Sequence, residues 1–569
     1  MTSSSEPEQR AQLPRTIEAK LPVQHGLSFP DYRAVTIIAS LISLAAFLHH
    51  SRSGELLLYG DAVAHMNIAR RVVDSRTPGL LQLGTVWLPL PHLLMLPFVA
   101  SKSLWSSGVG GAIPSMVAFI ASVLGIFRLV WKGLSFLPNY RSDARFTAWF
   151  AAFAYALNAN LLYLQSTAMT ETIYLAAYIW ATVWIAEFAI DLRRGDDKKS
   201  RRALVWCGVF LCLGALTRYD GWFAAASYAI VALAILIAAN LRSGLEPFQF
   251  LFDRYWRRTI LAFIFILAIT PAIWFTYNAL TFGDPLSFAR GPYSARAIEQ
   301  RTRRPGDPHH PGWNAPRVAA IYFVESAKLN VAATQRSEKI WFYAAVVGAV
   351  MTIGFIRPLW SWLLLWVPVP FYAISIAWGG VPIFIPKWWP FSYYNVRYGT
   401  QLIPALVVFG SVLVYLLLRR FSWKQAQYAV ALLSVAFVSV SYYYVWNSIP
   451  ISLREARVNA VDRMALEKEL AVQIERLPPS STIFMYLGEH GGALQRIGFP
   501  LKRTINEGNY RYWGSALMDP ARMADYVIAT EGDPIADAIK RHPEGLRLVT
   551  VVSALRQNPV RIYQSTEPH

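Results

Sequence analysis

The chain has 569 residues, of which 54% are hydrophobic and only 16% are charged. Soluble globular proteins carry about 25% charged residues, so this composition excludes an ordinary soluble protein and indicates one that lies largely in lipid. The formal net charge of +19 does not indicate a nucleic-acid partner, because much of it falls in short loops between apolar segments, where basic residues set membrane topology.

Apolar segments of membrane-spanning length recur along the chain. A transmembrane helix needs roughly 17–25 mostly apolar residues, and about eleven segments satisfy this condition. The segment 86–104 contains Pro89, Pro91 and Pro97, which interrupt a regular helix, so we expect it to dip into the membrane and return. The predicted spans lie near residues 33–49, 113–131, 147–165, 168–190, 203–217, 222–240, 258–280, 340–356, 359–378, 398–418 and 424–446.

The positions of Lys and Arg predict how the spans are oriented. The basic loop at 193–202 is expected to be cytoplasmic, because cytoplasmic loops of membrane proteins carry an excess of Lys and Arg. An N-terminal segment at 1–32 is then cytoplasmic, and the loops at 50–86, 281–339 and 379–397 are extracytoplasmic. We therefore predict an integral membrane protein of the cell (inner) membrane.

Residues 447–569 differ in composition from the predicted transmembrane domain at 33–446. A polar helical pattern at 453–476 is followed by short runs rich in β-branched and aromatic residues, the first at 482–486. This succession is typical of a small α/β domain. The predicted fold is an all-α polytopic membrane protein with a small α/β domain on the extracytoplasmic side after the last span.

Asp61 follows the first predicted span and begins an amphipathic helical pattern. Apolar residues between 63 and 73 fall on one side and Arg70, Arg71 and Asp74 on the other, which predicts a helix lying on the membrane surface. One interpretation makes Asp61 the N-cap of this helix, since Asp is a favoured cap. The other makes it a general base that takes a proton from an acceptor hydroxyl. The two roles are compatible.

Three further charged residues lie in short turns on the same predicted side of the membrane. Glu171 opens a span, where the helix dipole favours an acidic group, but a carboxylate at membrane depth is costly and often functional. We favour a functional role for it. Arg218 and Asp220 can pair with each other in a turn, but positive-inside topology does not require an outer arginine, so both are candidates for substrate binding.

The remaining candidates for substrate binding are His92, Arg290, Lys387, Tyr394 and Arg397. A histidine in an apolar segment is more often a packing residue than a catalyst, and the functional alternative is that His92 holds a lipid phosphate. Arg290 lies in a basic stretch that is either solvated or a clamp for lipid phosphate, because Arg binds phosphate oxygens in a bidentate manner. The aromatic residues around Tyr394 form an interface belt or stack on a sugar or isoprenoid. Arg397 opens a span and is expected to contact phosphate, as is Lys387.

Taken in order, these motifs resemble those of the GT-C superfamily of integral-membrane glycosyltransferases. Relatives of this kind include the protein mannosyltransferases and the lipid A aminoarabinose transferases. The resemblance covers most of residues 33–420 and not the C-terminal domain. The motifs are Asp61, Pro-Leu-Pro-His at 89–92, Met-Thr-Glu at 169–171, Thr-Arg-Tyr-Asp-Gly at 217–221 and Asn-Val-Arg-Tyr-Gly-Thr-Gln-Leu-Ile-Pro at 395–404.

The resemblance implies a sugar donor linked to dolichyl or undecaprenyl phosphate, used on the outer face with an acidic residue of the first loop as base. That residue is Asp61 here, with Glu171 as the second catalytic candidate. The family often has a paired Asp-Glu or Asp-Asp in this loop, whereas Asp61 lies between Gly60 and Ala62. Hard cations want several oxygen ligands, so no cofactor is expected, and a divalent metal is possible but not favoured.

The sequence therefore favours an inverting glycosyltransferase for a hexose or mannose-like sugar, in contact with membrane lipids and with an unidentified glycan, lipid or protein acceptor. A polytopic lipid or solute transporter or flippase is the alternative. Many transporters show internal repeats with paired broken helices, and the sequence has no such repeat. In a transporter the charged residues should line a path through both faces, whereas in a transferase they should cluster on one.

Overall fold

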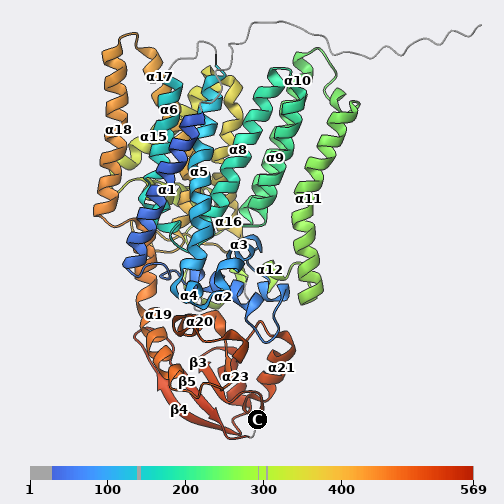
Figure 1. The fold of residues 1–569 in the computed structure, drawn as a ribbon, viewed down its shortest axis with the longest axis vertical. Coiled ribbons are helices and arrows are strands. Elements are labelled where there is room, and N and C mark those ends of the chain that lie inside the picture. Colours follow the sequence, from blue (N-terminus) through green and yellow to red (C-terminus); the bar gives the residue numbers. More distant parts are fainter. Residues whose placement is uncertain (1–28, 138–142, 292–293, 303–305, 568–569) are drawn as a thin grey trace, which may run out of the picture.

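The computed structural model describes residues 29–137, 143–291, 294–302 and 306–567. Most of the predicted N-terminal segment at 1–32 lies outside the described residues. Long helices form a bundle, and a smaller part with mixed helices and strands lies at one end of it (Figure 1). The C-terminal residues, drawn in red, make up this smaller part.

Nine helical stretches of the described residues are long and apolar enough to cross a membrane, so the chain is an integral membrane protein. Two of them join a short 3-10 helix to an α-helix, and another joins two α-helices. They are α1 (Phe29–Arg52), α5 (Val109–Ser135), α8 (Glu171–Arg193), α10 (Asp220–Arg242), α11 (Arg254–Phe282), α15 (Gln335–Phe355), η3 (Arg357–Trp366) with α16 (Pro368–Trp378), η4 (Val396–Leu402) with α17 (Ile403–Arg420), and α18 (Lys424–Asn447) with α19 (Ile451–Glu475).

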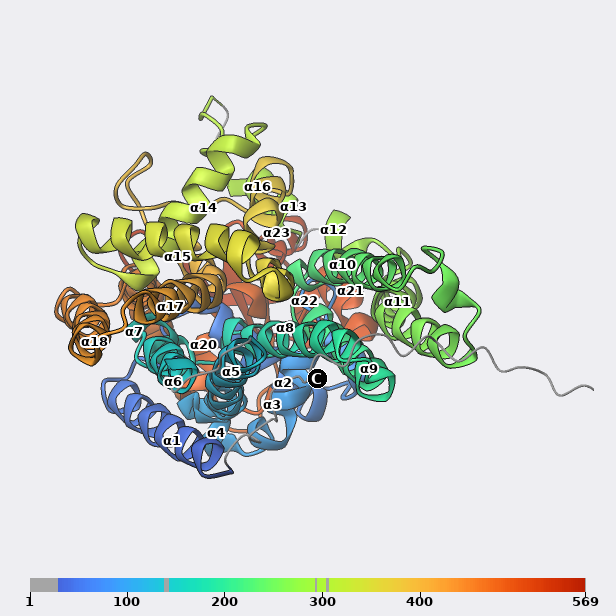
Figure 2. The ribbon, with the colours of Figure 1, turned by 90° about the horizontal axis from the view of Figure 1, so that it is seen from above.

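The predicted count of about eleven spans exceeds the nine candidate spans of the described residues, and the difference arises at two segments. The segment 147–165 is split into α6 (Asp143–Ala156) and α7 (Ala159–Leu164), because Asn158 caps a new helix with its side chain. The segment 203–217 belongs to α9 (Asp197–Ala215), whose first turns are highly charged. Both α6 and α9 nevertheless lie alongside the long helices of the bundle (Figures 1 and 2).

The segment 86–104 contains only a short apolar helix, and its predicted dip into the membrane stays a prediction. Its helix α3 (Leu90–Val99) has 10 residues and contains Pro97. At 1.5 Å per residue it is about 15 Å long, against a hydrocarbon core of about 30 Å. The chain then forms the short α4 (Lys102–Ser107) before α5 begins.

The C-terminal residues form the predicted α/β part. Its five-stranded sheet has the order β2-β1-β3-β5-β4, in which β1 pairs in parallel with β2 and β3, and β5 pairs antiparallel with β3 and β4. The strands are β1 (Ile483–Met485), β2 (Thr504–Ile505), β3 (Tyr526–Thr530), β4 (Leu546–Val552) and β5 (Val560–Ser565). The accompanying helices are α20 (Leu487–Ile497), η5 (Leu501–Arg503), α21 (Tyr510–Met518), α22 (Pro520–Met523) and α23 (Pro534–Arg541).

Helix α2 (Gly60–Val73) differs from the predicted free surface helix, because it lies between the bundle and the C-terminal part (Figure 1). Its apolar residue Met66 is fully buried, and residues on its polar side are also largely buried. Arg71 is 7% exposed and binds Glu507 at 3.0 Å. Both sides of this amphipathic helix therefore contact protein, one in the bundle and one in the C-terminal part.

Shorter elements fill several connections between the long helices. The long connection between α11 and α15 contains three of them. These short elements are η1 (Leu80–Leu83), α12 (Ser287–Arg290), α13 (Ala295–Thr302) and α14 (Pro316–Val331), and η2 (Gln249–Leu251) precedes α11.

Helices α15 and α17 approach each other closely at Gly348. A Cβ atom at this position would lie 1.9 Å from the carbonyl oxygen of Phe409. Small residues allow membrane helices to pack backbone against backbone. At Gly354, on the same helix, a Cβ atom would have no other atom within 4 Å, so this glycine faces open space.

We expect Gly348→Ala to lower the free energy of unfolding by about 1–3 kcal/mol, because α15 and α17 must move apart to admit the methyl group. The thermal unfolding midpoint in detergent measures this effect. Gly354→Ala is the matched control and should be neutral or stabilising by up to about 1 kcal/mol, since Ala is the better helix former. Equal destabilisation by both changes would contradict the close packing.

Candidate active site

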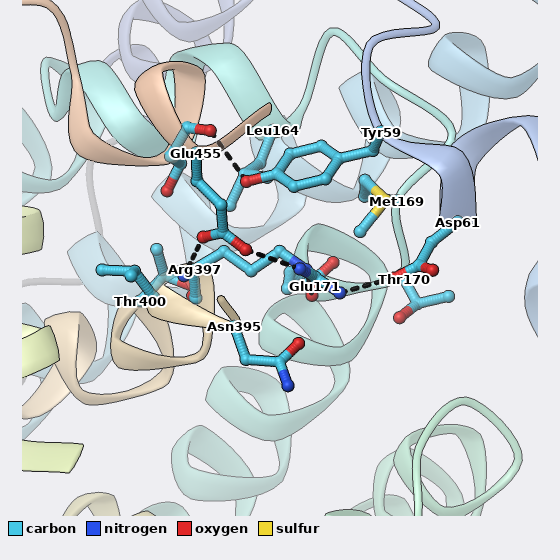
Figure 3. Close-up of polar contacts among 12 residues, drawn as sticks. Tyr59, Asp61, Leu164, Met169, Thr170, Glu171, Asn395, Arg397, Thr400 and Glu455 are labelled. Carbon is cyan, nitrogen blue, oxygen red and sulfur yellow. Dashed lines mark hydrogen bonds and ion pairs between the residues drawn. The ribbon is translucent and has the colours of Figure 1, made fainter. Parts of the chain in front are cut away.

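Arg397 binds three carboxylates that come from distant parts of the chain (Figure 3). Its Nη2 lies 2.5 Å from Asp61 Oδ2, and its Nε lies 3.1 Å from Glu171 Oε1. Its Nη1 lies 2.9 Å from Glu455 Oε1, and its backbone N–H donates to Glu455 Oε2 at 3.1 Å. The guanidinium also lies 4.8 Å from the ring centroid of Tyr59.

Each of these charged residues lies near the start of a helix, which explains how they meet. Asp61 is in the first turn of α2, and Glu171 is the first residue of α8. Arg397 is the second residue of η4. This helix begins directly after Asn395, whose left-handed backbone (φ 56°) turns the chain into it. Glu455 is in the first turns of α19. The helix starts therefore gather at one end of the bundle.

Asp61 is the accessible carboxylate of this cluster. Its side chain is 42% exposed, whereas those of Glu171 and Glu455 are 1% exposed and that of Arg397 is 7% exposed. Arg397 holds Asp61 through Oδ2, and no other hydrogen bond to this carboxylate occurs within the described part of the chain. One carboxylate oxygen thus remains open to an incoming group.

The capping interpretation of Asp61 is not what the geometry shows. The N-cap of α2 is Tyr59, which has an extended backbone and makes no side-chain capping bond. The Tyr59 hydroxyl instead donates to the backbone oxygen of Ser452 at 2.8 Å. Asp61 therefore binds Arg397 rather than the backbone of its own helix.

Arg218 extends the cluster toward Asp220. Its Nη1 lies 3.4 Å from Glu171 Oε1, and its Nε lies 3.1 Å from Asp220 Oδ2. The guanidinium groups of Arg218 and Arg397 lie 4.8 Å and 5.1 Å from the ring centroid of Tyr398. The two arginines therefore share both a carboxylate and an aromatic ring, and they act as one charged network.

The network leaves two buried carboxylate oxygens without a hydrogen bond among the described residues, Glu171 Oε2 and Asp220 Oδ1. The amide of Gln401 donates to Asp220 Oδ2 at 2.6 Å and to the Tyr372 hydroxyl at 2.7 Å. Buried polar atoms are normally paired, so the free oxygens offer acceptor positions to a bound molecule. In the described ranges, no group of three or more His, Cys, Asp and Glu side chains is placed to hold a metal ion.

His92 forms a buried pair with His65, its Nε2 lying 2.9 Å from His65 Nδ1. Burial lowers the pKa of His65 to about 3, and the charges of Arg218 and Arg397 contribute to this lowering. Burial also lowers the pKa of His92. Both rings are therefore neutral at pH 7 and belong to the packing between α2 and α3. A contact of His92 with lipid phosphate stays a prediction.

Three predicted binding residues lie outside the network. Lys387 binds Glu325 at 2.9 Å and Glu338 at 2.5 Å, so its charge is matched by other carboxylates. Arg290 is exposed at the end of α12. Tyr394 is 43% exposed and lies directly before the turn that positions Arg397. Their roles in substrate binding stay predictions.

Helix α12, which carries Arg290, packs on the turn of Arg218 through Phe288. The Phe288 ring stacks on Tyr219, with centroids 5.0 Å apart and an interplanar angle of 13°. Tyr219 lies between Arg218 and Asp220 in the chain. Helix α12 therefore lies against the turn that carries the second arginine.

Glu455 is the main residue that the sequence analysis missed. It lies in the polar helical pattern at 453–476, which was expected to belong to the separate C-terminal domain. The sequence feature that could have identified Glu455 is its position shortly after the last span, on the same predicted side as Asp61 and Arg397. Nothing in the local sequence distinguishes it from the other acidic residues of α19.

Arg397→Gln should lower the free energy of unfolding by about 3–5 kcal/mol, because it leaves the buried carboxylates of Glu171 and Glu455 without their counter-charge. Adding Glu455→Gln should restore part of this loss, since it removes one of the uncompensated charges. The measurement is a double-mutant cycle on the thermal unfolding midpoint.

The exposed Asp537 of α23, which is far from the cluster, provides the control. Combining Asp537→Asn with Arg397→Gln should give additive effects. If the effects of Arg397→Gln and Glu455→Gln were also additive, this result would contradict a direct contact between Arg397 and Glu455.

The histidine pair predicts a pH dependence of stability. The unfolded-state pKa of histidine is about 6.5 and the folded-state pKa of His65 is about 3, so the unfolded chain binds protons more readily. Stability should be full above pH 6.5 and fall below it by about 1.4 kcal/mol per pH unit for each histidine held neutral. Unfolding midpoints between pH 7 and pH 5 should show a shallower slope for His92→Gln than for wild type. Identical slopes would exclude the histidine pair as the source of the pH dependence of stability.

The chain has relatives only at the level of structure. No family model matches it, and no curated protein matches it in sequence. Among solved structures it is similar to ArnT from Cupriavidus metallidurans bound to undecaprenyl phosphate, with a TM-score of 0.51 and 13% identity over 95% of this chain and 99% of that chain. It also matches the archaeal oligosaccharyltransferase AglB from Archaeoglobus fulgidus, with a TM-score of 0.46 and 13% identity over 91% of this chain and 72% of that chain.

The likeness to ArnT extends beyond the region that carries the sequence motifs. Because it covers 95% of this chain, it includes residues of the C-terminal part, which the motif resemblance did not reach. The chain is therefore an integral membrane protein that shares the fold of ArnT.

Proposed function

We propose that the chain is a GT-C type glycosyltransferase that moves a sugar from a polyprenyl-phosphate donor to an extracytoplasmic acceptor. The observation that carries the proposal is Asp61, an accessible carboxylate held by the buried Arg397 at one end of a GT-C bundle. ArnT, which has this fold, was solved bound to undecaprenyl phosphate. The same chemical class of lipid is the proposed donor carrier here.

Asp61 is the proposed general base. Its exposed carboxylate takes the proton of an acceptor hydroxyl as that oxygen attacks the anomeric carbon of the sugar. Arg397 fixes the orientation of the carboxylate through Oδ2 and leaves the other oxygen for the proton. Glu171 is buried and bound to both arginines, so it positions the network rather than attacking the sugar. Direct displacement with one base inverts the anomeric configuration.

The leaving group is a lipid phosphate, whose developing negative charge needs positioned cations. Arg218 and Arg397 are already bound to carboxylates, so they contribute mainly by shaping the site. Arg290 is an exposed cation on α12, the helix that packs on Tyr219 through Phe288. We assign it the contact with the donor phosphate, with Tyr394 at the rim for the sugar or isoprenoid.

The distribution of charge supports a transferase over a transporter. Asp61, Glu171, Arg218, Asp220 and Arg397 form one connected network. A transport path requires polar groups distributed across the bilayer, whereas these residues gather at the starts of helices at one end of the bundle. Chemistry at one membrane surface accounts for this arrangement.

The orientation of two helices supports an extracytoplasmic site. Glu171 begins α8 and the basic loop at 193–202 follows its other end. Arg397 lies at the start of the span that ends with Arg419 and Arg420. Because basic residues favour the cytoplasmic side, both helices support the proposal that the network lies outside the cytoplasm, in the cell (inner) membrane.

Asp61→Asn should lower the rate of polyprenyl-phosphate release by about 10²–10⁴-fold, because the amide cannot accept the acceptor's proton. The measurement uses purified protein in lipid with a panel of radiolabelled polyprenyl-phosphate sugars. Asp537→Asn, an exposed change in α23, is the control and should retain wild-type activity.

Activity retained by a correctly folded Asp61→Asn protein would move the base elsewhere, with Glu171 as the next candidate. Release by neither wild type nor variant across a broad panel of sugars and acceptors would favour the transporter hypothesis. Wild-type unfolding midpoints for both variants would establish that the comparison concerns chemistry rather than folding.

A further inference from the structure

A pocket of about 510 Å³ is lined by residues of α14 and α15. Figure 2 shows these two helices toward one side of the bundle. None of the pocket's lining residues belongs to the Arg397 network. Helix α15 is a span, and α14 belongs to the connection that precedes it. The polar lining side chains are Arg317, Glu325, Lys328 and Lys339, and the aromatic ones are Phe342 and Tyr343.

The pocket carries an excess of positive charge. Arg317 and Lys339 are exposed, and neither forms an ion pair with a described residue. Glu325 is bound by Lys328 and by Lys387, the latter at 2.9 Å. The acidic group of the pocket is therefore already neutralised, and two cations remain without a partner in the described chain.

An exposed apolar stripe continues from the pocket along α15. The residues Ile340, Tyr343, Val347, Val350 and Ile353 are between 40% and 60% exposed. Their spacing of three or four residues places them on one side of the helix. In a membrane span this side contacts lipid chains, and Tyr343 suits the interface, where aromatic residues gather.

The boundary between charge and apolar surface coincides with the start of the span. The first residues of α15, from Gln335 to Lys339, are polar, and the apolar stripe begins at Ile340. A ligand that fills both regions has an anionic head at the membrane surface and an apolar chain along α15. Phosphate is the anionic group that membrane lipids carry there, and Arg and Lys both bind it.

We propose that the pocket between α14 and α15 binds the phosphate headgroup of an anionic membrane lipid, whose acyl chain lies along the exposed stripe of α15. Arg317 and Lys339 contact the phosphate, and Lys328 lies beside it. The lipid is a bound component of the membrane and not the sugar donor, because the pocket shares no residue with the Arg397 network. The proposal does not depend on the glycosyltransferase activity.

Native mass spectrometry of the detergent-purified chain with added phosphatidylglycerol tests the site. The double variant Arg317→Gln/Lys339→Gln should bind the lipid about 20–30-fold more weakly, since each lost hydrogen-bonded contact with the phosphate costs about fivefold. Each single variant should lose about fivefold. Arg336→Gln is the matched control and should bind as wild type does, because Arg336 is exposed in the first turn of α15 but does not line the pocket.

The outcomes that would overturn the proposal are distinct from those for the catalytic site. Equal binding by wild type and the double variant would overturn it, as would an equal loss in Arg336→Gln. Equal binding of phosphatidylcholine would show that the negative charge is not recognised. Displacement of the lipid by inorganic phosphate at similar concentrations would indicate a free-phosphate site instead. Unchanged unfolding midpoints in the variants would confirm that lost binding does not arise from misfolding.

Discussion

The buried positive charge of Arg397 is the constraint on which the arrangement of the site depends. A guanidinium that is 7% exposed needs counter-charges and hydrogen-bond acceptors, because transfer of an unpaired charge out of water is very costly. Asp61, Glu171 and Glu455 supply them from three separate helices. One side chain thereby fixes the first outer loop, the start of α8 and the start of α19 relative to one another.

Unequal burial divides the roles within this network. Glu171 and Glu455 are closed off from solvent and hold Arg397, whereas Asp61 is 42% exposed and retains a free oxygen. A base must be both oriented and reachable by its substrate. In the proposed mechanism, the buried carboxylates provide the orientation through Arg397, and the exposed position of Asp61 provides the access. The same unequal burial argues that Glu171 does not act as a nucleophile.

Two separate regions of the connections between spans carry the two proposed lipid contacts. The Arg397 network lies with α2, α8 and α19, while the cationic pocket lies with α14 and α15. Lys387 separates the two regions, because it binds Glu325 of the pocket wall and Glu338 rather than any member of the network. The two proposed phosphate contacts therefore lie at separate places on the chain, and only the Arg397 network includes an accessible carboxylate.

The membrane class, most spans and the C-terminal α/β part could be predicted from the sequence. The sequence also singled out Asp61, Glu171, Arg218, Asp220 and Arg397, which the structure brings into contact, while their roles stay predictions. Hydropathy and basic loops are local properties, and each motif occupies a short segment, so both can be read from the chain. Only the folded structure shows that Glu455 completes the cluster, that Lys387 lies outside it and that α2 is covered on both sides. These facts depend on which helix starts meet in space. An ion pair between residues 336 positions apart, such as Asp61 and Arg397, leaves no trace in the local pattern of either segment.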